Sequence, residues 1–127
     1  MYYKIQTNKD FETATSDLEK CVIDGGFGVM HIHNIGNTLR SKGVEFAENC
    51  NVLEVCNPKI AAQVMAQDMQ LNMALPCRIS VYTQNGDTLI GMIKPEKMLS
   101  SLSDSDELKT IALGVEQTLM QMIDNAK

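Results

Sequence analysis

The chain has 127 residues, which suffices for one domain with a hydrophobic core of its own. Hydrophobic residues make up 44% and charged residues 21%, the balance of an ordinary soluble globular protein. The net charge of -5, without a run of Lys or Arg, argues against a nucleic-acid partner. No apolar run is long enough to cross a membrane and the first residues lack the layout of a signal peptide, so we expect a cytoplasmic protein without a membrane partner.

The four cysteines, Cys21, Cys50, Cys56 and Cys77, contain no Cys-x-x-Cys pair. Structural zinc sites usually show such pairs, so the sequence does not predict one. In a reducing compartment these residues are expected to be free thiols, and a buried free Cys behaves as a small hydrophobic residue.

The N-terminal residues predict a strand followed by a long helix. Tyr2 to Thr7 alternate between apolar and polar side chains, as a half-buried strand does. Asn8 or Asp10 can cap a helix that runs to about Ile23, because apolar residues recur there at helical spacing. Gly25-Gly26 then ends this helix.

The segment FGVMHIHN predicts a second strand. Alternation puts Met30 and Ile32 on one face and Val29, His31 and His33 on the other. The two histidines are therefore expected to point the same way.

The segment VLEVC predicts a third strand, in which Leu53 and Val55 face the core. Glu54 and Cys56 then lie on the opposite face. Asn57-Pro58 favours a helix start, because Asn is a good cap and Pro suits the first helical position.

Asn85-Gly86 predicts a two-residue type I′ turn between a fourth strand, opened by Pro76, and a fifth strand that ends at Lys94-Pro95. This turn imposes a register that makes one face of the hairpin wholly apolar, and a one-residue slip would scramble both faces. The predicted pairs are Ile79 with Met92, Val81 with Ile90, Tyr82 with Leu89, Ser80 with Gly91, and Arg78 with Ile93.

The last helix has the most regular amphipathic pattern in the chain. It is capped within Ser103 to Ser105 and runs to about Asp124. The connections between these elements give weaker patterns. One or two helical turns are expected at 37–42 and one at 96–102, whereas residues 44–51 show no period. The helix that starts at Pro58 should end near 68–70, and the segment 71–75 after it fits a helix or an extended chain equally well.

This order of elements predicts a single α+β domain over residues 1–127. We expect a β-α-β4-α arrangement, with an antiparallel sheet of about five strands and the two long helices on one face. A short helix is expected between the third and fourth strands.

Four stretches, FGVMHIHNI, EVCNPKIAAQVM, LPCRISVY and QNGDTLIGMIKP, together resemble the family known as domain of unknown function 302. The resemblance covers nearly the whole chain and centres on Cys-Asn-Pro at 56–58 and Leu-Pro-Cys-Arg at 75–78. It implies a TATA-binding-protein-like fold, often as a homodimer, and no established reaction. The function of a protein depends on its specific sites and not on its fold, so the name of the fold does not imply DNA binding.

Cys56 and Cys77 are the first candidate site. If the third and fourth strands are neighbours, both thiols lie at one edge of the sheet, beside the helix that starts at Pro58. A helix N-terminus stabilises a thiolate, so Cys56 is a candidate nucleophile, redox residue or ligand. Alternation opposes a shared face, because it groups Cys77 with Ile79 in the core. The alternative is that Cys77 is a buried packing residue and Cys56 only ends its strand.

His31 and His33 are the second candidate site. Two residues apart on one strand, they lie about 7 Å apart along the chain and could begin a metal site. Glu54 or Cys56 would supply further ligands from the same face. The alternative is a pair of polar residues on an exposed or interfacial face. No complete ligand set follows from the sequence, so the metal and any cofactor stay unassigned.

The open face of the sheet is the third candidate site. Arg78 could bind a carboxylate or phosphate there, and Tyr82 could flank a ligand. Because this face carries many apolar side chains, we expect it to be covered by a second copy of the chain or by a small molecule. A second copy is favoured, since twofold dimers are the commonest assembly. The residues expected on this face are Arg78, Ser80, Tyr82, Leu89, Ile93 and Val29.

No established catalytic or cofactor motif is present, so binding is expected ahead of catalysis. The leading hypothesis is a small cytoplasmic homodimeric binding module that takes a small molecule or metal on or beside the open sheet face. The alternatives are thiol-based redox or nucleophilic chemistry at Cys56, with His31 or His33 as base, and a purely structural dimer.

Overall fold

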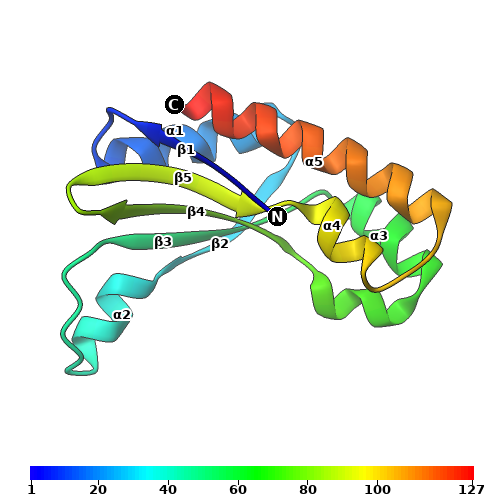
Figure 1. The fold of residues 1–127 in the computed structure, drawn as a ribbon, viewed down its shortest axis with the longest axis horizontal. Coiled ribbons are helices and arrows are strands. Elements are labelled where there is room, and N and C mark those ends of the chain that lie inside the picture. The colour runs from blue at the N-terminus through cyan, green and yellow to red at the C-terminus, as the bar shows by residue number, and fades with distance from the viewer.

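A five-stranded antiparallel sheet forms the centre of the protein, with its strands in the order β1-β5-β4-β3-β2 (Figure 1). The structure is a computed structural model that describes residues 1–127. The strands are β1 (Tyr2–Thr7), β2 (Gly28–Asn34), β3 (Cys50–Cys56), β4 (Cys77–Gln84) and β5 (Asp87–Ile93). The helices are α1 (Phe11–Asp24), α2 (Ile35–Ser41), α3 (Pro58–Gln67), the 3₁₀ helix η1 (Met69–Ala74), α4 (Pro95–Ser100) and α5 (Asp106–Ala126).

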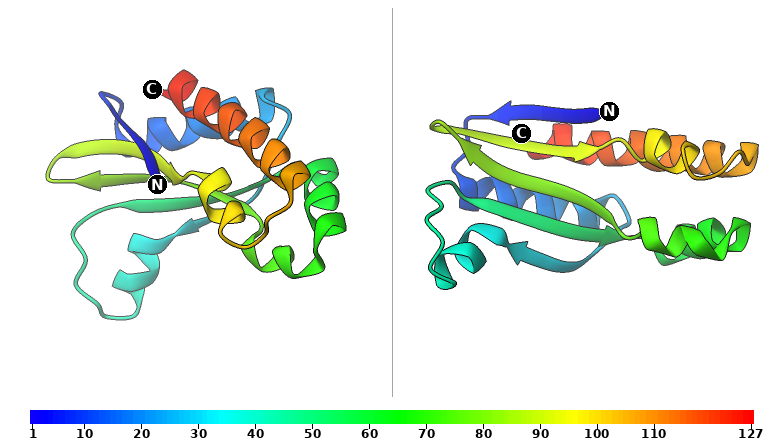
Figure 2. Two further views of the ribbon diagram at one scale, coloured as in Figure 1. Left: turned by 45° about the vertical axis from the view of Figure 1, so that its right-hand side comes forward. Right: turned by 60° about the horizontal axis from the view of Figure 1, so that its bottom comes forward.

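The two long helices, α1 and α5, lie on one face of the sheet, as the sequence predicts (Figure 1 and Figure 2). The opposite face is open along the middle of the strands. It is flanked by α2 under one end of the sheet and by α4 and the green segment that contains η1 at the other end (Figure 1). The predicted α+β class and the five-stranded antiparallel sheet are confirmed.

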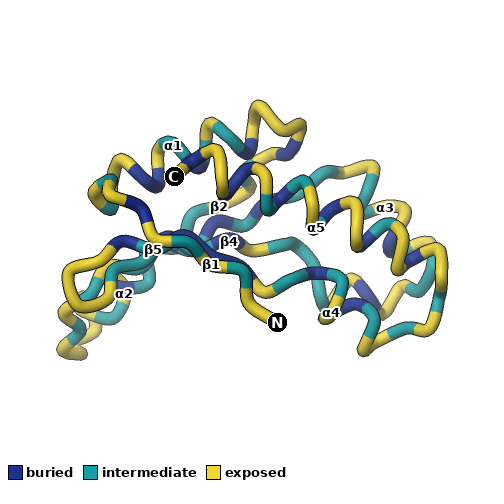
Figure 3. The backbone as a smooth tube through the Cα atoms, turned by 45° about the horizontal axis from the view of Figure 1, so that its top comes forward, coloured by how far each residue is buried: buried dark blue, intermediate teal, exposed yellow.

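The core lies between the sheet and the two long helices, where Figure 3 colours the backbone as buried. The predicted inward faces of β3 and of the β4-β5 hairpin are confirmed, because alternate residues of these strands are buried. A second, smaller core joins α3, η1, α4 and α5 beyond the end of the sheet. The main core includes Leu18, Val22, Leu53, Val55, Ile79, Val81, Ile90, Leu119 and Ile123.

Local signals in the sequence fix the ends of several elements. Asn85 and Gly86 take positive φ angles of 52° and 89°, as a type I′ turn requires, and β4 pairs with β5 in the predicted register. The Asn57 side chain accepts a hydrogen bond from the amide of Lys59, and Pro58 occupies the first turn of α3. After α3 ends, the ambiguous segment forms the 3₁₀ helix η1 and not an extended chain.

The predicted faces of β2 are partly wrong, because this strand contains an irregularity of register between Val29 and His31, of the β-bulge type. Val29 pairs with Val55 and packs against the core, whereas strict alternation places it on the open face. Met30 is 62% exposed instead of facing inward. A bulge adds one residue to a strand and reverses the alternation beyond it. His31 therefore pairs with Glu54 and still lies on the open face.

Polar contacts hold the connection between α2 and β3, for which the sequence shows no period. Nη1 of Arg40 donates to the carbonyl oxygens of Phe46 at 2.7 Å and Glu48 at 3.0 Å. The Glu48 carboxylate accepts from the Thr83 hydroxyl at 2.9 Å and from the Asn85 amide at 2.8 Å. The connection is thereby tied to the end of the β4-β5 hairpin.

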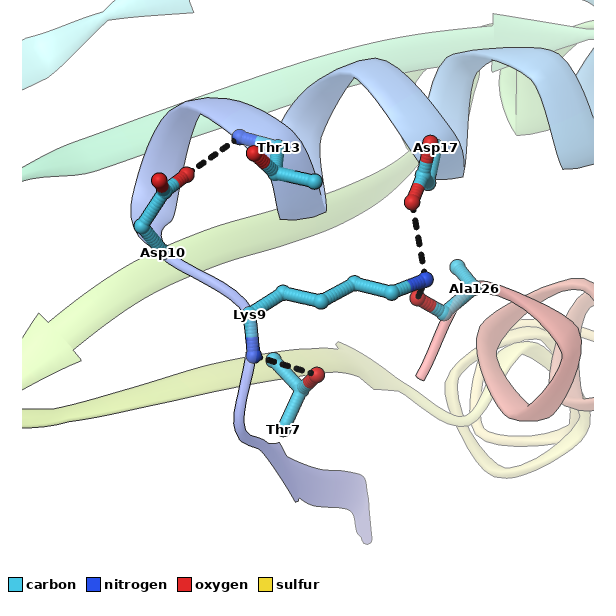
Figure 4. A network of polar contacts seen from close by, with 6 residues as sticks. All are labelled: Thr7, Lys9, Asp10, Thr13, Asp17 and Ala126. Atoms are coloured by element: carbon cyan, nitrogen blue, oxygen red, sulfur yellow. Dashed lines mark hydrogen bonds and ion pairs between the residues drawn. The ribbon is translucent and has the colours of Figure 1, made fainter.

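A polar network fixes the C-terminus of α5 against the start of α1 (Figure 4). Nζ of Lys9 lies 2.8 Å from Oδ2 of Asp17 and donates to the carbonyl of Ala126 at 2.8 Å. The hydrogen bond from Lys9 lowers the pKa of the Asp17 carboxyl. Asp10 caps α1 by accepting from the Thr13 amide at 2.7 Å. The two helices of the covering layer are therefore joined at this end.

The hairpin turn gives the first testable prediction. Gly86→Ala is expected to lower the free energy of unfolding by about 1–2 kcal/mol, because a side chain at positive φ is strained. The matched control is Gly114→Ala in α5, where an added Cβ meets nothing within 4 Å. This control should raise the free energy of unfolding by up to about 1 kcal/mol. Urea denaturation measures both changes, and equal effects of the two substitutions would contradict the account of the turn.

Candidate functional site

The open face of the sheet carries its side chains in three cross-strand rows, which the register of the strands fixes. Each row runs from β1 through β5, β4 and β3 toward β2. The rows consist of Tyr2, Ile93, Arg78, Glu54 and His31, then of Lys4, Gly91, Ser80, Val52 and His33, then of Gln6, Leu89, Tyr82 and Cys50. The predicted candidates Arg78, Tyr82, His31, His33 and Glu54 therefore share one face.

A hollow of about 490 Å³ lies on this face, at the end of the sheet where β1, β5 and β4 meet η1 and α4. One wall is formed by Met73 to Pro76 and the other by Pro95 and Met98. Its volume lies within the range of about 300–1,000 Å³ that is usual for small-molecule sites. Of the 18 residues that line it, 12 are hydrophobic, so the hollow is mainly apolar with a few polar groups.

Gly91 gives the floor of the hollow its depth. A Cβ atom at this position would lie 2.9 Å from Cβ of Lys4 and 3.0 Å from the carbonyl oxygen of Tyr3, which is closer than such atoms approach. A larger residue would push β1 away from β5. The next residue in the row is Ser80, which is also small. The small residues Gly91 and Ser80 therefore leave a depression at the centre of the face, surrounded by longer side chains.

The polar groups of the hollow are cationic or neutral. Its lining contains Lys4 and Arg78 and no carboxylate, although the whole chain has a net charge of -5. Neither cation takes part in an ion pair, since the one Lys or Arg ion pair of the chain is Lys9 with Asp17. Glu54 is the cross-strand neighbour of Arg78, but its Oε1 lies 3.0 Å from Nε2 of His33.

The histidine pair lies on the open face but outside the lining of the hollow. The rings of His31 and His33 are 4.3 Å apart between centroids, in an edge-to-face arrangement. His33 is hydrogen-bonded to Glu54, so two of the four candidate ligands, which also include His31 and Cys56, are already in contact. No group of three or more His, Cys, Asp or Glu side chains is arranged to hold a metal ion anywhere in the chain. The geometry therefore adds no support to the metal hypothesis.

Cys56 and Cys77 lie near each other, at the end of the sheet beside α3. Both line a small cavity of about 30 Å³, and Cys77 pairs across the strands with Val55 and packs against the core. Burial raises the pKa of the Cys77 thiol to about 11, and the neighbouring Cys56 adds to the rise. At neutral pH Cys77 is therefore a protonated packing residue and a poor nucleophile.

Neither histidine is the cross-strand neighbour of Cys56, for which the sequence suggests His31 or His33 as a base. The cross-strand partner of Cys56 is Gly28, whereas His31 lies opposite Glu54. His33 is one pair further along and is bonded to the Glu54 carboxylate. The geometry therefore adds no support to either histidine as the base that nucleophilic catalysis at Cys56 would require.

Several residues of the hollow were missed by reasoning from the sequence. Lys4 and Tyr2 come from β1, whose pairing with β5 has no local signal in the sequence. Met73 and Met98 belong to two of the connections for which the sequence gives only weak patterns. One signal was present, because the hairpin register sets Gly91 opposite Ser80 on the open face. A pair of small residues at the centre of a face indicates a depression.

These features define a class: an α+β protein with one face of its sheet covered by helices and a lined hollow on the other. The chain belongs to the family described as domain of unknown function DUF302, whose model matches residues 3–126. The resemblance that the sequence indicates is confirmed. No helix combines the length and apolarity needed to cross a bilayer.

One solved structure similar to this chain is the crystal structure of an uncharacterised conserved DUF302 protein from Bacillus stearothermophilus. The two share 32% sequence identity and superimpose with a TM-score of 0.94, over 99% of this chain and 98% of the other. No curated protein matches the chain. The comparisons thus establish family and fold, and any function has to be argued from the site.

The raised pKa of Cys77 gives the second testable prediction. Because its pKa is higher in the folded than in the unfolded state, the thiol favours folding at low pH, and this contribution is lost as the pH rises from about 9 to 11. The difference between a pKa of 9 and one of about 11 corresponds to about 2–3 kcal/mol of stability. The stability difference between wild type and Cys77→Ala should shrink by about 2 kcal/mol, most of that amount, between pH 7.5 and pH 10.5, in urea denaturation under reducing conditions. A difference that is independent of pH would contradict the burial of this thiol.

Proposed function

We propose that this chain is a small cytoplasmic binding module, acting as a homodimer, which takes a small molecule into the hollow on its open sheet face. The observation that carries the proposal is the hollow itself, of about 490 Å³, with Arg78 free of ion pairs at its edge. A mainly apolar depression with a few polar groups is the usual form of a small-molecule site.

The construction of the hollow favours binding over a merely irregular surface. Its floor consists of paired strands, so the positions of Ser80, Gly91 and Val52 are fixed by the sheet. Sites built on such elements hold their geometry better than sites on loops. Ser80 and Tyr82 offer hydroxyl groups to a ligand beside the cation of Arg78.

A purely structural dimer is the second candidate, and the rim of the hollow favours it. Tyr2 is 71% exposed, Met73 is 77% exposed and Ile93 is 49% exposed, all at the edge of the same depression. Exposed apolar side chains gathered in this way often mark an interface. A second copy seated here would cover the rim, and in the leading proposal it would also roof the hollow.

Ligand binding is tested by a thermal-shift screen of metabolites and organic ions against wild type and Ser80→Leu. The larger side chain fills the floor of the hollow, so it should abolish any shift while the fold remains. A ligand at 100 times its Kd adds about 2.7 kcal/mol, or roughly 10 °C in Tm. The control is Ser16→Leu, an exposed position on α1 across the sheet, which should keep the shift. A screen without any hit, or hits that survive Ser80→Leu, would remove the hollow as the binding site.

Dimerisation is tested by sedimentation equilibrium at micromolar concentration. Wild type should sediment as a dimer, and Ile93→Glu at the rim should sediment as a monomer. Leu113→Glu changes another exposed apolar residue, 39% exposed on α5, and should leave the dimer intact. A monomeric wild type would overturn both the homodimer and the structural-dimer candidate, while the hollow would still be testable for a ligand.

A further inference from the structure

The charges around the hollow restrict what its ligand can be. Arg78 and Lys4 lie in two adjacent rows of the open face, on β4 and β1. They are separated by two strand spacings, about 10 Å, across the sheet and by two residues, about 7 Å, along it. Both side chains are long enough to turn toward one group between them, over the low floor at Gly91 and Ser80.

These cations form no ion pair within the protein. The carboxylate nearest to Arg78 across the strands, Glu54, is bonded to His33. No carboxylate lines the hollow, and neither Arg78 nor Lys4 forms an ion pair. The charged residues that line the hollow are both cations, although the whole chain has a net charge of -5.

Three kinds of ligand fit this lining poorly. A cation would be repelled by Arg78 and Lys4 and would find no carboxylate. A neutral apolar molecule would take water away from both cations without replacing it, which is costly for charged groups. A small inorganic anion would leave the apolar walls at Met73 and Met98 unused.

We propose that the hollow takes an organic anion with an apolar body, whose carboxylate or phosphate oxygens are bound by Arg78 and Lys4. This inference rests on the proposed function of the hollow and names the ligand class for that site. The guanidinium of Arg78 presents paired N–H donors that match two anionic oxygens, and such charge-assisted hydrogen bonds are stronger than neutral ones. The apolar body lies against Met73 and Met98, between η1 and α4.

The test is isothermal titration calorimetry with five probes that share or lack the two features. Octanoate and octyl phosphate carry an apolar body and an anion, octanol carries only the body, octylamine carries the opposite charge, and acetate carries only the anion. Octanoate or octyl phosphate should bind at least roughly ten-fold more tightly than octanol, and the stronger of the two names the anionic group. Octylamine and acetate should not bind. Added salt should weaken the binding of the anionic probes.

The variants Arg78→Gln and Lys4→Gln test the roles of the two cations. Each variant should weaken the binding of octanoate roughly ten-fold and leave the affinity for octanol unchanged. Lys109→Gln, which removes an exposed positive charge on α5, is the matched control and should change neither.

The outcomes separate this inference from the proposed function. Octanol that binds as tightly as octanoate, and is lost in Ser80→Leu, would retain the hollow as a binding site but overturn the anionic ligand. Octanoate binding that is indifferent to Arg78→Gln and Lys4→Gln would also overturn it. The failure of every probe to bind would count against the proposed function itself, and the ligand class would fall with it.

Discussion

The register of β4 against its two neighbours is the constraint on which the rest of the structure depends. β4 pairs with β5 through the turn at Asn85-Gly86 and with β3 on its other side. Because successive residues point to opposite faces, Ile79 and Val81 enter the core while Arg78 and Ser80 reach the open face. A one-residue slip would bury the Arg78 cation and expose the core residues. The same strand pairing therefore determines both the stability of the fold and the side chains that reach the candidate site.

The hollow follows from this sheet and from the connections at its end. Gly91 and Ser80 are neighbours in one cross-strand row, which keeps the floor low. The walls come from η1 and α4, which the second hydrophobic core holds together with α3 and α5. The main core therefore fixes the floor and the smaller core fixes the walls. A site assembled in this way keeps its shape without a ligand, which lowers the entropic cost of binding.

The three candidate sites of the sequence lie on different parts of the sheet, although Cys77 is shared between two of them. The cation and hydroxyls of β4 border the hollow. Cys77 lines both the hollow and the small cavity beside α3, whereas Cys56 lines only that cavity. The histidines lie on β2, where His31 pairs with Glu54 and His33 is hydrogen-bonded to it. Cys77 is held as a protonated thiol by burial.

Much of this arrangement could be predicted from the sequence where a local rule applies. The turn at Asn85-Gly86, the helix start at Asn57-Pro58 and the alternation of β3 each have a short-range cause, and each is confirmed. The irregularity before His31 could not be predicted, because strict alternation carries no sign of an extra residue. Nor could the place of Lys4 beside Gly91, because the pairing of β1 with β5 joins segments more than 80 residues apart through contacts that no local pattern encodes.

The most direct test of the central claim is a heteronuclear NMR titration of the amide groups with octanoate. The account predicts saturable chemical-shift changes at Arg78, Ser80 and Gly91, on the floor and edge of the hollow, with little change at His31 on the far strand. The same titration of Ser80→Leu should leave these amides unmoved. Shifts centred on the histidines or on Cys56, or shifts at the floor that persist in Ser80→Leu, would contradict the assignment of the hollow as the binding site.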